Sequence, residues 1–297
     1  MINSSIFNTV FFNPERSRGD GAKTINGDCW FYTEICNILE ITGVNHQNEC
    51  VKVPPTINRK QVLDINTWAF KSDERLKGVE LSHGIENIKS KAFYGCKNLL
   101  YVKIPASVVD IAPDAFLSCC GIERFDVDIY NQRYKSGAGM LLTKDGTTLI
   151  QGIKGNVIVP NGVERINARA FQDGKGLRSV TIPSSVKYVG DFAFSGCCNL
   201  TNIVFPCNVK RIGDYAFSSC SELTVATIPD LKNCEVGKGI YHGCYNLREI
   251  RFPRSCIENQ NEIILQCIGE CSPNLEISYY NATSINRNQT PSVTIDW

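Results

Sequence analysis

S-V-T-I-P-S-S-V-K-Y-V-G-D-F-A-F (residues 179–194) is followed by N-I-V-F-P-C-N-V-K-R-I-G-D-Y-A-F (residues 202–217), which is the same phrase written again. Phe194 and Phe217 are 23 residues apart (217 − 194), and so are Pro183 and Pro206. Self-similarity at a fixed period of this size is typical of a solenoid, in which each repeat forms one coil and stacks on the next. The extent of the phrase therefore sets the extent of the fold.

The repeated phrase contains two hydrophobic periodicities. A Val-x-Ile-Pro segment alternates apolar and polar residues as a strand does, and the proline that follows has no N–H and ends the ladder. The next segment places apolar residues three and four apart and turns the chain back around the coil. We expect a β-rich repeat solenoid with repeats of about 23 residues and one continuous parallel sheet. Its predicted aromatic core ladder is Phe70, Phe93, Phe116, Phe171, Phe194, Phe217 and Tyr241.

The fifteen cysteines follow the repeat. Five of them lie three residues after the ladder aromatic, namely Cys96, Cys119, Cys197, Cys220 and Cys244. A small, weakly polar side chain suits a buried position, and equivalent residues of stacked coils come to lie about 4.8 Å apart. We therefore interpret most cysteines as free and buried, which favours a reducing compartment. A disulfide among the cysteines near the chain ends remains open.

The phrase divides the chain into regions. Residues 1–50 lack it and are expected to form an N-terminal cap, because an open solenoid end exposes apolar core and a strand edge. Residues 51–253 form the solenoid, which is interrupted at 128–156 by a predicted two-stranded hairpin that turns at Asp145-Gly146. Residues 254–297 are expected to form a C-terminal cap, with a short helix at 258–271, a strand near 275–277 and a loosely held polar tail from 279 onward.

Composition excludes several classes of function. Lys+Arg is 31 against Asp+Glu 30, which gives a net charge of +1 and does not support nucleic-acid binding or a polybasic membrane patch. No apolar run is long enough to span a bilayer, and the N-terminus shows no signal peptide. The three histidines, His46, His83 and His242, are expected to be exposed turn residues. We predict no cofactor, no metal site and no enzymatic activity, because no nucleophile has an evident base.

The phrase A-F-x-G-C-x-x-L-x-x-V-x-I-P-x-S-V-x-x-I resembles the BspA-type leucine-rich repeat family, also called the Treponema type, over residues 51–253. The insertion is similar to one found in that family, through Tyr134-Lys135-Ser136 and the run from Lys144 to Ile150. The resemblance implies surface proteins of mucosal bacteria and parasitic protists that adhere to host matrix proteins or to other cells. It implies no catalytic residues.

A protein partner is expected on the outward side chains of the strands, because solenoids present extended concave surfaces. The first candidate patch is the uncharged C-terminal half of the sheet, made of Thr181, Thr201, Asn202, Val204, Thr224, Val225 and Thr227. The second is the insertion, with Tyr130 and Tyr134. Three functions stay open: cell-surface adhesion through a protein partner, an intracellular interaction scaffold in the cytoplasm, and, least favoured, a thiol-dependent enzyme.

Overall fold

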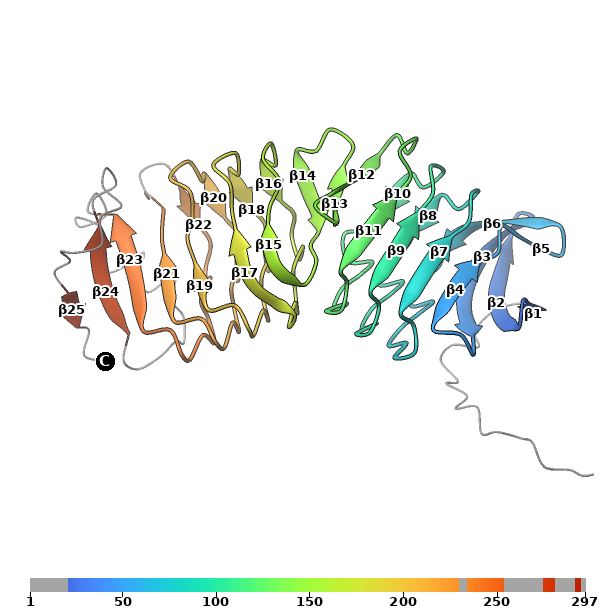
Figure 1. Ribbon diagram of the computed structural model, residues 1–297, viewed down its shortest axis with the longest axis horizontal. Coiled ribbons are helices and arrows are strands. Elements are labelled where there is room, and N and C mark those ends of the chain that lie inside the picture. Colours follow the sequence, from blue (N-terminus) through green and yellow to red (C-terminus); the bar gives the residue numbers. More distant parts are fainter. Residues whose placement is uncertain (1–20, 230–233, 254–274, 281–291, 295–297) are drawn as a thin grey trace, which may run out of the picture.

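The computed structural model describes residues 21–229, 234–253, 275–280 and 292–294, and in these residues the chain is a β-solenoid without a helix (Figure 1). Each coil contributes one strand to each of two sheets. Figure 1 shows the sheet of longer strands face-on, with the array gently arched in the plane of the picture. The solenoid class predicted from the 23-residue period is therefore confirmed.

The long-strand sheet is parallel and follows the Val-x-Ile segments of the repeat. Its strands are β4 (Cys50–Val53), β7 (Gly78–Leu81), β9 (Tyr101–Ile104), β11 (Arg124–Val127), β15 (Gly155–Ile158), β17 (Leu177–Thr181), β19 (Asn202–Ile203), β21 (Val225–Thr227), β23 (Glu249–Pro253) and β24 (Glu276–Tyr280). The strand ladder is not continuous, because no hydrogen-bonded pairing joins β11 to β15 or β17 to β19. The first break lies where the insertion enters the solenoid. At the second break β17 and β19 remain in contact.

The short-strand sheet lies on the opposite side of the coils. Like the long-strand sheet it is not continuous, because no hydrogen-bonded pairing joins β10 to β14. Its N-terminal part contains β6 (Lys60–Ile65), β8 (Asn87–Ile88) and β10 (Asp110–Ile111), while β5 (Thr56–Ile57) pairs with β6. Its C-terminal part contains β14 (Thr148–Gln151), β16 (Arg165–Ile166), β18 (Tyr188–Val189), β20 (Arg211–Ile212) and β22 (Glu235–Val236). Side chains that point inward from the two sheets meet between them and form the core.

The aromatic ladder residues lie in this core and are all buried. Phe194 stacks on Phe171 and on Phe217, with ring centroids 4.8 Å apart on each side and planes within 9° of parallel. Phe70 and Phe93 stack in the same way at 4.7 Å. The buried residues divide into two hydrophobic clusters, one on each side of the insertion.

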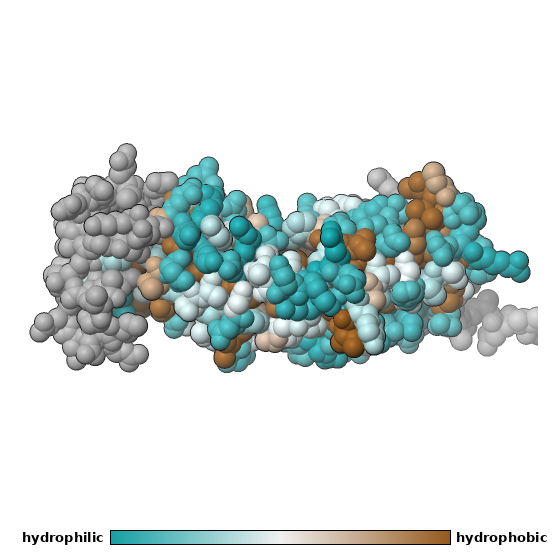
Figure 2. Space-filling view, turned by 90° about the horizontal axis from the view of Figure 1, so that it is seen from above, coloured by the Kyte–Doolittle hydropathy of each residue, from teal (hydrophilic) through white to brown (hydrophobic). Residues whose placement is uncertain are grey.

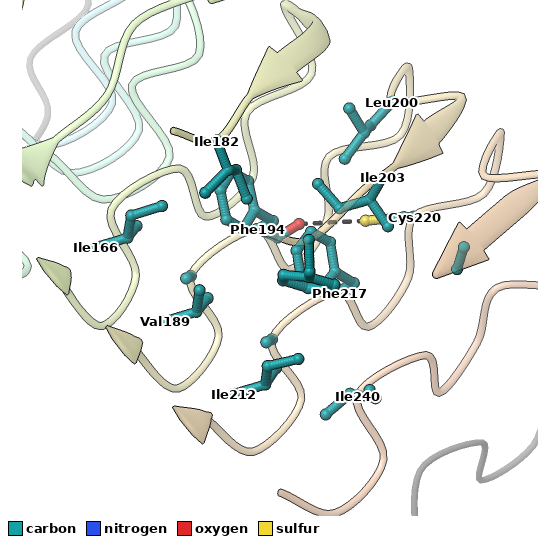
Figure 3. Close-up of a cluster of buried hydrophobic side chains, with 14 of the residues drawn as sticks. Ile166, Ile182, Val189, Phe194, Leu200, Ile203, Ile212, Phe217, Cys220 and Ile240 are labelled. Carbon is teal, nitrogen blue, oxygen red and sulfur yellow. Dashed lines mark hydrogen bonds between the residues drawn. The ribbon is translucent and has the colours of Figure 1, made fainter. Parts of the chain in front are cut away.

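The five ladder cysteines are buried, and each thiol donates a hydrogen bond to the backbone carbonyl of the ladder aromatic in the preceding coil. Figure 3 shows this bond between Cys220 Sγ and the carbonyl oxygen of Phe194, which are 3.2 Å apart. The carbonyl oxygen of Phe194 also accepts from the N–H of Cys197 in its own coil at 3.2 Å, so the thiol of the next coil is a second donor to the same oxygen and links the two coils. Burial raises the pKa of the Cys197 thiol far above its ordinary value, which keeps the sulfur protonated and unreactive.

The insertion contains the predicted hairpin, which turns at Asp145-Gly146, and one further strand that the sequence did not indicate. β12 (Tyr134–Gly137) and β13 (Met140–Thr143) pair antiparallel, β13 pairs antiparallel with β14, and β14 pairs parallel with β16. The last strand of the predicted hairpin is therefore also the next member of the short-strand sheet. Asn131, at the start of the insertion, is completely buried; its amide NH2 donates to the carbonyls of Pro105 and Val108, and its amide oxygen accepts from the N–H groups of Arg133 and Tyr134.

At the N-terminal end, β1 (Gly21–Ile25), β2 (Asp28–Ile35) and β3 (Ile38–Asn45) form an antiparallel meander whose last strand pairs parallel with β6. Trp30 on β2 is buried edge-on against Phe70, with ring centroids 6.4 Å apart. The meander therefore covers the first rung of the aromatic ladder. Residues 1–20 of the expected cap lie outside the described residues.

At the C-terminal end, the helix predicted at 258–271 lies outside the described residues. The predicted final strand is β24, which pairs parallel with β23. The prediction of a loose tail from residue 279 is wrong for two segments. β24 continues to Tyr280, and β25 (Ser292–Thr294) pairs antiparallel with it and forms the edge of the sheet.

Candidate functional site

The long-strand sheet presents one outward row of side chains that changes character along the solenoid. Strand register places Lys52, Glu80, Lys103 and Asp126 side by side in the N-terminal half. In the C-terminal half Ile158 lies beside Thr181, and Thr227 lies beside Arg251 and then Ser278. The row is therefore charged before the insertion and mainly uncharged after it.

The charges of the N-terminal half are paired with one another. Lys52 Nζ lies 2.8 Å from Glu80 Oε1, and Lys103 Nζ lies 3.6 Å from the same oxygen. The hydrogen bond from Lys52, with the charge of Lys103, holds the pKa of Glu80 below its usual value. A hollow of about 540 Å³ opens over this row, with His83 and Asp128 also on its wall. Apolar side chains, including Leu81, Ile104 and Val127, also line the hollow beside these paired charges.

The first candidate patch lies on the C-terminal half of the sheet, and its residues differ in exposure. Thr181, Thr201, Asn202 and Val204 are exposed, while Thr224, Val225 and Thr227 are half-buried. The inner threonines are turned to the backbone. Thr224 Oγ1 donates to the carbonyl of Thr201 at 3.1 Å, and Thr227 Oγ1 accepts from the N–H of Phe205 at 3.1 Å. A partner would therefore meet the exposed residues first.

Ile158 extends this patch and was missed in the sequence. It is 69% exposed and pairs in register with Thr181, while Val204 is 63% exposed two strands further on. The signal was present, since Ile158 is the middle residue of Val157-Ile158-Val159, where the alternation of the strand points it outward. Two β-branched apolar side chains thus stand on the open face of the sheet.

The two tyrosines of the second candidate patch lie in different surroundings. Tyr130 is 73% exposed, next to Ile129, which is also exposed. Tyr134 is buried, and its hydroxyl oxygen accepts a hydrogen bond from the N–H of Ile111 at 3.0 Å. The expectation that Tyr134 is available to a partner is therefore wrong, because the side chain holds the insertion against the preceding coil.

The prediction that all three histidines are exposed is wrong for His46. His83 is exposed, and His242 is half-buried edge-on against Tyr215. His46 is only 4% exposed, and its Nε2 lies 2.9 Å from Asp73 Oδ2. Asp73 stands three residues after Phe70, at the repeat position that cysteines hold in other coils, whereas His46 lies outside the repeat, so no period relates the two residues.

Among the described residues, no cluster of three or more histidine, cysteine, aspartate or glutamate side chains is placed to hold a metal ion. All cysteines in these residues are free thiols, with Cys36, Cys50 and Cys207 exposed. Cys119-Cys120 and Cys197-Cys198 are neighbours in the sequence, and in each pair the first cysteine is buried and the second is partly exposed. No helix in the described part of the chain is long and apolar enough to cross a membrane.

Comparison with known families matches residues 45–138 and 154–269 to the BspA type leucine-rich repeat region, in six copies. The chain belongs to this family. The gap between the two matched stretches falls within the insertion, where the repeat register is interrupted. Comparison with curated proteins found no match.

Solved structures share the fold of this leucine-rich repeat protein. A leucine-rich repeat protein from Eubacterium ventriosum is 20% identical, with a TM-score of 0.53 over 84% of this chain and 83% of that one. The pneumococcal vaccine antigen PcpA is 16% identical, with a TM-score of 0.50 over 79% and 82%. A leucine-rich cell surface protein from Faecalibacterium prausnitzii is 17% identical, with a TM-score of 0.49 over 79% and 89%.

Proposed function

We propose that this leucine-rich repeat protein binds a protein partner through the long-strand sheet and serves in adhesion at a cell surface. The observation that carries the proposal is the mainly uncharged C-terminal half of the sheet, where Ile158 is exposed in register with Thr181 and Val204 is exposed directly after β19. Isolated exposed apolar residues are common, but here two stand on the same half of one sheet. Figure 2 shows that the surface seen from above is largely hydrophilic, with only separate hydrophobic spots.

The cost of removing water favours this half of the sheet over the other. A partner that covered Lys52, Glu80 and Lys103 would have to desolvate an ion-paired row, which offsets much of the gain from contact. Apolar groups carry no such penalty and a hydroxyl carries a smaller one than a charge, and the centres of protein interfaces are depleted in charged residues. Charged residues such as Arg251 at the end of the row then fit the polar rim of an interface.

Adhesion is supported by the family. Members are expected to occur at the surfaces of bacteria and protists, and a protein of similar fold is a pneumococcal vaccine antigen. The test is surface plasmon resonance of the full chain over a panel of immobilised soluble matrix proteins. We expect at least one to bind, and Ile158→Asp and Val204→Asp each to weaken binding at least tenfold. Val109→Asp, an exposed valine outside the long-strand sheet, is the matched control and should leave binding unchanged.

Three results would contradict parts of this proposal. Unchanged binding by Ile158→Asp and Val204→Asp would remove the patch, and loss of binding with Ile129→Asp alone would move the site to the insertion. Failure of every matrix protein to bind would contradict adhesion.

The second candidate function, an intracellular scaffold, is favoured by the free thiols of the described cysteines. It is tested by counting free thiols, native and denatured, on protein purified from its own host without reductant. Nearly all fifteen cysteines free would favour the scaffold, and several disulfides would favour an exported adhesin.

A further inference from the structure

Three buried ionisable residues meet where the N-terminal meander joins the first coil. Asp28 is the first residue of β2, His46 directly follows β3, and Asp73 lies in the turn after Phe70. Their exposures are 6%, 4% and 3%. Buried charges are costly unless they are paired, so a cluster of this kind at a junction needs a physical reason.

The hydrogen-bond geometry sets the protonation state of His46. Its Nε2 lies 2.9 Å from a carboxylate oxygen of Asp73, and its Nδ1 lies 2.5 Å from the carbonyl oxygen of Asn48. Both oxygens are acceptors, whereas a neutral imidazole has only one N–H to donate. Only the doubly protonated imidazolium can donate to both, so the contacts select the charged form of His46.

The surrounding groups act in the same direction. Burial lowers the pKa of His46, but the hydrogen bond and charge of Asp73, the Asn48 carbonyl and the charge of Asp28 outweigh it and hold the pKa above 6.5. Burial also raises the pKa of Asp28, against the opposing effects of His46 and the N–H of Gln47. Oδ1 of Asp28 has no hydrogen-bond partner among the described residues.

The other charged groups near this junction are engaged elsewhere. Asp73 Oδ1 accepts from the N–H of Arg75 at 3.2 Å, which orients the carboxylate towards His46. Glu49, which follows Asn48, is exposed and pairs with Lys77 Nζ at 2.7 Å. The charges that face His46 from the elements packed against it are therefore Asp28 from β2 and Asp73 from the coil turn.

We propose that Asp28, His46 and Asp73 form a proton-dependent latch that fastens the meander β1–β3 over the open end of the solenoid. The His46–Asp73 pair is the ionic contact of the latch and joins segments 27 residues apart (73 − 46). It stands beside the apolar contact of Trp30 with Phe70. When the imidazolium loses a proton, one ring nitrogen presents a lone pair to an oxygen lone pair, and the attraction becomes a repulsion.

The pKa values of His46 and Asp28 are both raised in the folded chain, so the protonation of each group changes stability with pH in the same direction. When the pKa of a group is raised on folding, the group contributes its full stability at pH values below its pKa in the unfolded chain. That stability is lost as the pH rises through the pKa of the group in the folded chain. For His46 that loss begins above 6.5, and for Asp28 it begins above its ordinary value of 3.8. The meander is therefore held more tightly at mildly acidic than at alkaline pH, until acid strong enough to protonate Asp73 breaks the ion pair.

The first test is proton NMR titration of the histidine ring C–H signals in the full chain, with His46 assigned by its absence in His46→Gln. We expect the pKa of His46 to lie above 6.5 in the wild type and to be lower in Asp28→Asn. This substitution removes a neighbouring negative charge without changing the side-chain shape. His83→Gln, at an exposed position, is the control and should leave His46 unchanged. Titration of His46 at or below 6.5 would overturn the proposal.

The second test is hydrogen exchange of the β2 and β3 amides at pH 6 and pH 9, corrected for the intrinsic rates. Protection should fall at least tenfold at pH 9 in the wild type, while amides of β21 and β23 at the other end change little. Asp73→Asn should make the protection of β2 and β3 nearly independent of pH. Equal protection of the wild-type meander at both pH values would show that these charges do not control the closure, and would overturn the latch even if Asp73→Asn failed to fold.

Discussion

Phe194→Ala tests the stacked core that the repeat encodes. Phe194 has no exposed surface, and both faces of its ring stack on ladder aromatics, Phe171 and Phe217, at 4.8 Å. Replacing a fully buried phenylalanine by alanine costs about 3–5 kcal/mol, through lost transfer free energy and the cavity left behind. The neighbouring rings are fixed by their own coils and cannot close the cavity, so we expect a value in the upper part of this range.

The assay is urea unfolding followed by far-ultraviolet circular dichroism. With a slope of about 3 kcal/mol per molar urea, a loss of about 3–5 kcal/mol lowers the midpoint by about 1–1.7 M. Phe192→Ala is the matched control, because Phe192 is half-buried in the outer turns, where it stacks on one aromatic ring, Tyr215, and contacts the Arg169 guanidinium. It should lose about 0.5–1.5 kcal/mol, the range for an aromatic pair. An unchanged midpoint for Phe194→Ala, or equal shifts for the two variants, would refute the ladder.

Three further changes probe the insertion, the close contacts and the thiols. Asn131→Ala removes a hydrogen bond from four backbone groups, of which the Pro105 carbonyl keeps the N–H of Val108 as a partner, and should destabilise the chain by about 3 kcal/mol or more in urea unfolding; a loss below about 1 kcal/mol would show that the insertion does not depend on this side chain. Gly152→Ala should lower the thermal midpoint, since its new Cβ would lie 2.0 Å from the buried Phe171 ring, and Phe171→Leu in the same chain should recover part of the loss. In mass-spectrometric alkylation at pH 8, Cys207 should react within minutes and Cys197 only after denaturation, because burial raises the pKa of Cys197 and excludes the reagent; native labelling of Cys197 would contradict the buried thiol ladder.

The surface residues show how far an alternating pattern predicts a binding face. Alternation correctly placed Thr181 and Val204 outward, because side chains on a strand point to opposite faces whatever the partner strand is. It failed for Tyr134, whose strand β12 packs against the preceding coil rather than standing free. Period alone assigns a residue to a face, but the packing of the next element decides whether that face is exposed.

The sequence by itself determined the solenoid, the core aromatics and the buried cysteines. Equal spacing of 23 residues brings equivalent positions of successive coils into stacked rows, so contacts such as Phe194 with Phe217 follow from numbering alone. These interactions are local in the sense that each coil meets only its neighbours.

Only the tertiary structure decided the contacts made outside the repeat. The His46–Asp73 pair, the buried Asn131 and the entry of β14 into the short-strand sheet all join segments with no common register. Their geometry depends on how the cap and the insertion close against particular coils, and no periodicity specifies that closure. The repeat therefore encodes the stack, while the irregular segments place the ionic and polar groups through which this protein can respond to its surroundings.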